Sequence, residues 1–196
     1  MIRWCRGIIA IAGGLYFGST WADLNDIGND GWYTWKVDAR PSAPVMCCFT
    51  WNRGIATRQS CDLDSHRGGF GSNDQSLDEG VGLQLYVRKE AGRTTKIRAL
   101  SASCPVTAAA GITDIGPVTR NASIDWLSDV VGPDEDLSDN AILAISMHTG
   151  SGIGALIGFV EDRSLDMDLR ESALFWLVQT DSDEAFEFVD RILDDS

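Results

Sequence analysis

Apolar side chains occupy every second position in three stretches of the first half of the chain, 33–39, 45–51 and 81–87. A β-strand sends successive side chains to opposite faces, so this period of two predicts strands. Residues 94–103 alternate as well and are rich in β-branched residues. The turn-forming segment 90–93 then predicts a hairpin with the strand before it.

We expect a small antiparallel sheet or sandwich of about four to six strands, a usual size for such sheets. The polar, glycine-containing stretch that follows Trp51 and extends to Gly80 reads as a long loop. Trp32, Trp35 and Trp51 are expected in the core, because tryptophan in an alternating strand usually packs inside. The alternative is an exposed aromatic platform that binds a carbohydrate or a peptide.

The pattern changes to a helical period after Pro105. Apolar residues recur at spacings of three and four, and Gly, Pro, Ser and Asp punctuate the runs, which predicts five helices. Asn121 or Ser123 could cap the first helix, and Ser138 the second. The expected helical stretches are 123–131, 139–148, 155–161, 166–178 and 183–193.

Four of these stretches repeat in two pairs. The residues at 141–145 (AILAI) align with those at 173–177 (ALFWL) at an offset of 32, and Ala155 aligns with Ala185 at an offset of 30. This resembles the HEAT-repeat, armadillo-like proteins, most clearly over 170–177 and 182–189. The resemblance implies a short α-solenoid of helical hairpins that binds other proteins along a curved groove. It carries over no catalytic residue.

The first residues have the pattern of an export signal. Arg3 and Arg6 precede an uncharged stretch over 7–20, and Ala22 precedes a polar segment. This order is typical of a secretory signal peptide cleaved after Ala22. The apolar stretch is short beside the roughly 20 residues that cross a bilayer as a helix. We expect a periplasmic or secreted protein with no membrane span after cleavage, the alternative being a signal retained as an anchor.

The expected fold is therefore α+β, with a signal peptide at 1–22 and a disulfide-containing β domain at 23–105. A connection at 106–122 leads to acidic HEAT-like helical repeats at 123–196. Cys47, Cys48, Cys61 and Cys104 are an even set for an oxidising compartment. A bond between the neighbours Cys47 and Cys48 is disfavoured, and each of them could pair with either Cys61 or Cys104. Because neighbours on a strand face opposite ways, one bridge could lie inside the core and the other outside.

The acidic residues gather in the last third of the chain. Residues 23–122 include 11 acidic and 11 basic side chains, whereas 123–196 include 18 acidic side chains and three arginines. Such a surface repels nucleic acid and favours a basic protein partner. Net charge also serves solubility, which is a sufficient reason for it by itself.

The sequence contains only weak motifs for metal binding, catalysis or nucleotide binding. Asp62 and Asp64 faintly resemble a calcium loop, which Asp74, Asp78 and Glu79 could extend, but a histidine stands where a third oxygen ligand belongs. Cys47, Cys48, Cys61 and His66 could suggest zinc, although adjacent cysteines have the wrong spacing. His148 is expected near a helix end, where a cation suits the helix dipole. The glycines between 150 and 154 miss the spacing of a dinucleotide-binding turn.

We therefore predict no catalytic residue, no cofactor and no metal site beyond those weak candidates. The expected function is an exported, non-catalytic protein–protein interaction module that acts through the acidic repeats. The alternative is a carbohydrate- or peptide-binding module that uses Trp32, Trp35 and Trp51. An uncharacterised hydrolase is the least favoured reading.

Overall fold

The central element of the protein is a four-stranded sheet in the order β7–β6–β1–β9, in which β1 pairs antiparallel with β6 and parallel with β9. The computed structural model describes residues 24, 27–53, 55–65, 70–76, 82–150 and 152–194, with the backbone alone at 70–76. The expected signal peptide, His66, Asp78 and Glu79 lie outside these residues.

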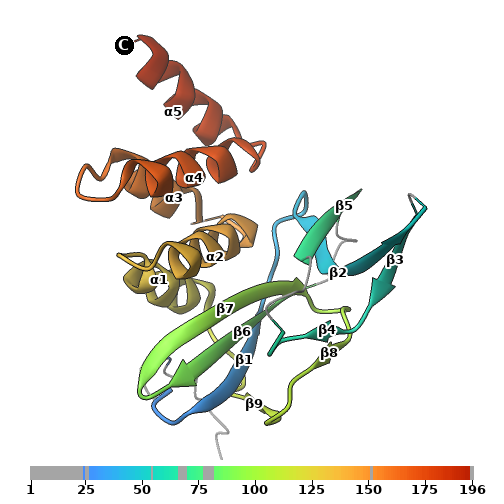
Figure 1. The fold of residues 1–196 in the computed structure, drawn as a ribbon. Helices are drawn as coiled ribbons and strands as arrows, with labels where there is room; N and C mark the ends of the chain where they lie inside the picture. The colour runs from blue at the N-terminus through green and yellow to red at the C-terminus, as the bar shows by residue number, and fades with distance from the viewer. Residues whose placement is uncertain are drawn as a thin grey trace, which may run out of the picture.

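Within the described residues, nine strands precede five helices, so the fold is α+β. The elements are β1 (Gly31–Val37), β2 (Pro44–Asn52), β3 (Ile55–Gln59), β4 (Cys61–Asp62), β5 (Phe70–Ser76), β6 (Leu83–Glu90), β7 (Arg93–Ser101), β8 (Val106–Thr107), β9 (Ile112–Asp114), α1 (Arg120–Val130), α2 (Glu135–Met147), α3 (Gly152–Glu161), α4 (Met167–Val178) and α5 (Asp183–Asp194). Figure 1 shows the helices rising from the sheet towards the C-terminus. None of the helices in this described part of the chain is long and apolar enough to cross a membrane.

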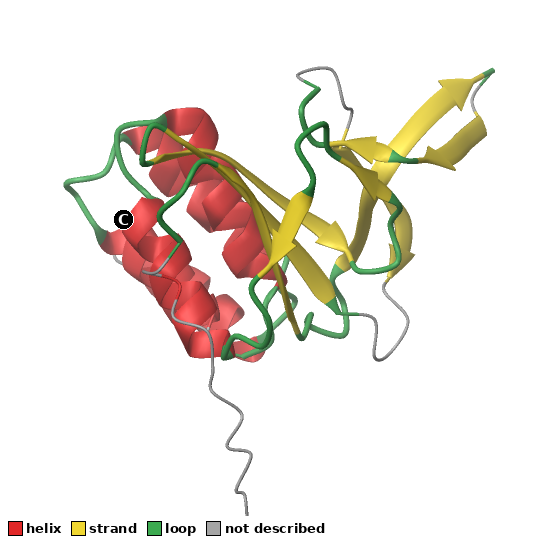
Figure 2. Ribbon diagram, turned by 90° about the horizontal axis from the view of Figure 1, so that it is seen from below, coloured by secondary structure: helices red, strands yellow, loops and turns green. Residues whose placement is uncertain are grey.

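Both faces of the four-stranded sheet are covered. Figure 2 shows the helices on one side of it and the smaller sheets on the other. Trp35 faces the helices, where its ring meets Trp126 of α1 edge-on at a centroid distance of 5.5 Å. Trp32 faces the other way, and its Nε1 donates to Asp64 Oδ1 over 2.8 Å. One fully buried tryptophan therefore anchors each face, which confirms the core positions expected for these two residues.

Trp51 is an exception, and its expected core position is wrong. Its side chain is 70% exposed, because β2 continues past the core as a two-stranded ribbon with β3. Within β2, residues 45–48 are buried, and those from Thr50 onward are exposed. Figure 1 shows this ribbon projecting away from the rest of the molecule.

The expected long loop between β2 and β6 is also wrong in part. It contains β3 and β5, which flank β2 in a second sheet, and β4, which pairs in parallel with β8. The expected connection at 106–122 likewise contributes β8 and β9. These short polar strands have little hydrophobic alternation of their own, so only pairing with distant partners defines them.

The β6–β7 hairpin is confirmed. Its turn places Ala91 at φ 50° and Gly92 at φ 73°, the two positive values of a type I′ turn, whose twist matches that of the flanking strands. Glycine takes this conformation without steric cost, whereas Ala91 is held there by the pairing on either side.

The two disulfides are Cys47–Cys104 and Cys48–Cys61. Because Cys47 and Cys48 are neighbours on β2, their side chains leave opposite faces of the strand. One bridge ties β2 to the segment after β7, and the other ties it to β4. All four cysteines are buried, so neither bridge lies on the outside.

The first three helices begin earlier than their sequence predicts. Thr119 caps α1 by accepting the Ala122 N–H, and Asp134 caps α2 by accepting the Leu137 N–H. Ser123 and Ser138, which we expected at caps, instead lie inside the helices and are buried. Two acidic residues in the first turn of α2 also suit the positive end of the helix dipole.

The helices pack successively, α1 against α2, α2 against α3 and α4, and α3 against α4. Gly152 opens α3 directly against α2, where a Cβ would stand 2.5 Å from the Ile145 carbonyl oxygen. Close helix packing therefore requires this glycine.

We predict that the two disulfides contribute unequally to stability. Cys47–Cys104 encloses 57 residues and Cys48–Cys61 encloses 13. Loop-closure entropy assigns about 4 kcal/mol to the first and about 3 kcal/mol to the second. The double variant Cys47→Ala/Cys104→Ala should lose about 1 kcal/mol more than Cys48→Ala/Cys61→Ala in urea unfolding. The reverse order would show that local packing, rather than chain entropy, dominates.

Candidate functional site

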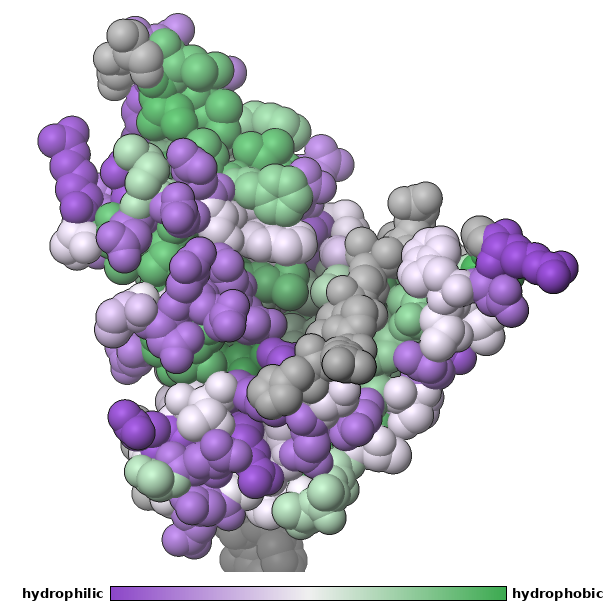
Figure 3. Space-filling view, viewed as in Figure 1, coloured by the Kyte–Doolittle hydropathy of each residue, from purple (hydrophilic) through white to green (hydrophobic). Residues whose placement is uncertain are grey.

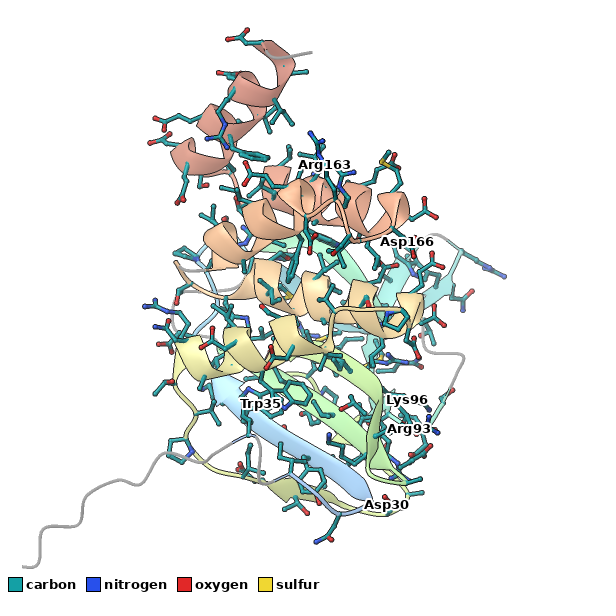
Figure 4. All side chains as sticks on the ribbon, turned by 90° about the vertical axis from the view of Figure 1, so that its left-hand side faces the viewer. Asp30, Trp35, Arg93, Lys96, Arg163 and Asp166 are labelled. Carbon is teal, nitrogen blue, oxygen red and sulfur yellow. A yellow bond between two sulfur atoms is a disulfide. The ribbon has the colours of Figure 1, made fainter. Side chains whose placement is uncertain are left out.

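The three tryptophans considered for ligand binding do not share a surface. Trp32 and Trp35 are 1% and 0% exposed and face opposite sides of the sheet, whereas Trp51 stands on the outer ribbon. Figure 4 shows Trp35 between the sheet and the helices. The structure thus brings no two of them together as a platform.

Asp62 and Asp64, the weak cation candidates, are occupied by hydrogen bonds. Asp64 accepts from Trp32 Nε1 and from the Ala109 N–H, and Asp62 Oδ1 accepts the Asp64 N–H. The Ala109 and Trp32 bonds lower the pKa of Asp64. Asp64 therefore fastens the segment after β4 over Trp32. Among the described residues no group of three His, Cys, Asp or Glu side chains could hold a metal ion, and Cys47, Cys48 and Cys61 are all in disulfides.

His148 ends a buried chain of hydrogen bonds. Trp35 Nε1 donates to Ser123 Oγ over 2.9 Å, and His148 Nε2 lies 3.0 Å from the same oxygen. His148 Nδ1 lies 2.7 Å from the Ala144 carbonyl oxygen, which can only accept. Nδ1 therefore carries the proton, and the Ser123 hydroxyl donates to Nε2. Every polar atom in this chain has a partner.

A serine beside a histidine is also the pairing of a nucleophile and its base. Here Ser123 is 0% exposed and His148 is 2% exposed, so a substrate has no access to either side chain. A backbone carbonyl orients the imidazole, and the tryptophan N–H engages the hydroxyl oxygen. The geometry explains this pair as a link between β1, α1 and α2.

Burial determines the charge state of His148 in this buried link. Burial lowers the pKa of His148 to about 4, against the opposing effect of the Ala144 hydrogen bond, and the positive charge of Arg120 lowers it further. The imidazole is therefore neutral at neutral pH, as the hydrogen-bond pattern requires.

Two of the grooves along the described residues border α1, α3 and α5. One of about 840 Å³, between β1 and the start of α1, mixes charges of both signs through Lys36, Asp38, Asp114 and Arg120. The other, of about 500 Å³, lies between α3 and α5. It has an apolar floor and a mostly acidic rim, formed by Ile157, Glu161, Glu184, Glu187, Phe188 and Arg191.

The clearest exposed apolar surface is on the last two helices, and we call it the terminal face. α4 is apolar on both sides: Leu169, Ala173 and Leu177 are buried inward, while other large side chains point to solvent. A helix that is apolar all round normally has neighbours all round. The terminal face consists of Met167, Phe175 and Val178 of α4 with Phe186 and Leu193 of α5.

α5 contributes to the terminal face because its apolar residues extend around more of the helix than its neighbours cover. Ala185 and Phe188 are buried, whereas Phe186 and Leu193, seven residues apart, are 47% and 67% exposed. Figure 3 shows hydrophobic residues gathered over α5. An exposed apolar cluster with a polar border is typical of an interaction site.

Sequence reasoning found the acidity of this region but missed the terminal face. Periodicity shows that one side of a helix is apolar and not whether anything covers that side. One signal was available in the sequence: α4 contains more apolar residues than one buried side of a helix needs, which indicates a second apolar side.

Comparison of the chain with models of protein families, with curated proteins and with solved structures finds no match.

We predict that Ser123→Ala destabilises the fold by about 1–3 kcal/mol, since it leaves the buried Trp35 N–H and His148 Nε2 without partners. Ser128→Ala is the matched control. Ser128 lies on the same helix, and its Oγ donates to the Ile124 carbonyl at a half-buried position. Its loss should cost less than about 1 kcal/mol in urea unfolding. Equal losses would contradict a special role for the buried link.

We predict a stability loss on mild acidification that depends on His148. The folded pKa is about 4 against 6.5 for the ordinary group, so unfolding takes up a proton between these values. The stabilisation is complete above pH 6.5 and is lost as the pH falls towards 4. Between pH 7 and pH 5, above most carboxylate titration, the loss should reach about 2 kcal/mol. Denaturant unfolding of wild type and His148→Gln should show it in the wild type alone; the same loss in both would refute the assignment.

Proposed function

We propose that this chain is an exported, non-catalytic protein–protein interaction module that acts through its acidic helical region, built as HEAT-like repeats. The observation that carries the proposal is the terminal face, where five large apolar side chains on two neighbouring helices are exposed. A surface of this kind gains free energy when a partner covers it.

The packing of the helices supports a repeat. Residues 141–145 and 173–177 align at an offset of 32, and the first and last residue of each segment lie on the inner sides of α2 and α4: Ala141, Ile145, Ala173 and Leu177. Ala141 and Ala173 are both fully buried, and α2 and α4 contact each other. In a stack of repeated helical hairpins the last unit has a side that no neighbour covers, and the terminal face occupies that place.

Two buried disulfides support a location outside the cytoplasm, because such bonds persist in oxidising compartments. They also stiffen the β region that carries the helices. The β region would then act as a rigid support, with Trp32 and Trp35 used for packing.

The test is site-specific photo-crosslinking in the exported protein. A photoreactive phenylalanine analogue at Phe175 or Phe186 preserves the aromatic character of each site. It should give adducts with another protein on irradiation. The same analogue at Trp51, which is also a strongly exposed aromatic residue, is the matched control and should give few.

Adducts at Phe175 and Phe186 alone would support the proposal. Absence of adducts at both positions would contradict it. Adducts at Trp51 alone would favour ligand binding by the β domain instead.

A further inference from the structure

We propose that the terminal face binds an amphipathic helix of a partner protein, with apolar residues along its centre and Lys or Arg along its edges. This inference rests on the proposed function and specifies the chemistry of the partner.

The apolar residues of the terminal face form a strip of helical spacing on each helix. Met167, Phe175 and Val178 lie within one side of α4, at offsets of eight and eleven residues. Phe186 and Leu193, which are seven residues apart, likewise lie on one side of α5. Phe175 is also held in place, since its ring meets Trp176 edge-on at 5.0 Å. An ordered aromatic side chain loses less entropy when a partner covers it.

Acidic side chains border this strip. Asp183 and Asp190 precede Phe186 and Leu193 by three residues, and Glu171 precedes Phe175 by four, so each carboxylate lies beside its apolar neighbour. All three carboxylates are exposed. Over 162–194 the chain has ten acidic residues and three arginines.

Two of these arginines are engaged on other sides of the helices. Arg191 pairs with Glu161 of α3 at 3.0 Å, and Arg170 donates to the Val160 carbonyl. The third, Arg163, lies in the turn between α3 and α4. The border of the strip is therefore negative, and its electrostatic complement is a cationic edge.

This charge selects among the possible occupants. A second copy of the chain would bring the same excess of seven negative charges to the contact, and an anionic bilayer would also be repelled. A helix fits better than a strand because two helices offer ridges and grooves for side chains of a third. A peptide that binds as an added β-strand would need an open strand edge, which helices do not offer.

The experiment uses a labelled synthetic Leu/Lys amphipathic peptide of about 18 residues, five helical turns, and a Leu/Glu peptide of the same pattern. Fluorescence anisotropy measures their binding to the exported protein. The Leu/Lys peptide should bind and the Leu/Glu peptide should not. Phe186→Ser/Leu193→Ser should weaken binding by about tenfold or more, as loss of central apolar contacts does. Trp51→Ser removes an exposed apolar side chain elsewhere and should leave binding unchanged.

Charge variants distinguish specific binding at the terminal face from general electrostatic attraction by the net charge. Glu171→Gln/Asp190→Asn should weaken binding several-fold. Asp129→Asn/Asp139→Asn removes two carboxylates from α1 and α2 and should change it little. Circular dichroism checks that the variants remain folded. Equal binding by wild type and Phe186→Ser/Leu193→Ser would overturn the inference, since the peptide would then be held by net charge alone.

The outcomes distinguish this inference from the proposed function. Crosslinks at Phe175 and Phe186 without peptide binding would leave a protein-binding module whose partner is not a basic helix. Absence of both would remove both proposals. A concentration-dependent dimer abolished by Phe186→Ser/Leu193→Ser would identify a second copy as the occupant and overturn the inference.

Discussion

The buried hydrogen bonds from Trp35 through Ser123 to His148 join one strand to two helices, and the rest of the fold is arranged around these three elements. They connect the central strand β1 to α1 and to the end of α2. The same end of α2 is fastened by Arg40, whose N–H and Nε donate to the carbonyls of Met147 and Ser146. Terminal helix carbonyls lack partners within the helix, so these bonds both satisfy them and fix the first helix layer on the sheet.

The sheet can carry the helices because it is itself covered on both sides. A four-stranded sheet with one face in water would bury only the side chains of its other face. Here the second face is closed by the segment after β4, which Asp64 holds over Trp32 through its bonds to Trp32 and Ala109. The disulfides on either side of β2 then fasten that cover to the core. The result is a rigid support from which α3, α4 and α5 extend.

Distance from this support determines where the protein can interact. The inner helices α1 and α2 are committed to the sheet, whereas α4 and α5 contact few elements besides their helical neighbours. Their outward apolar residues therefore remain exposed, and the acidic charge of the chain is concentrated around them. Apolar side chains provide the affinity of such a contact, and the surrounding charge selects the partner.

Local patterns in the sequence determined the elements that are locally encoded. Alternation gave β1, β2 and the β6–β7 hairpin, helical spacing and breakers gave five helices, and an even set of cysteines gave disulfides. The starts of α1 and α2 were displaced by several residues, because Thr119 and Asp134 were as capable of capping as the serines chosen. The short strands β3, β4, β5, β8 and β9 were missed, since their pairing depends on distant partners.

Tertiary structure alone decided which of two similar residues is buried. Trp35 and Trp51 both sit in alternating strands, yet one lies under α1 and the other on a ribbon beyond the core. Ser123 and Ser128 lie on one helix, but only Ser123 meets a histidine and a tryptophan. Phe186 and Phe188 share α5, yet only Phe188 is buried. Sequence period records which residues share a side of an element; what lies against that side depends on contacts between residues far apart in the chain.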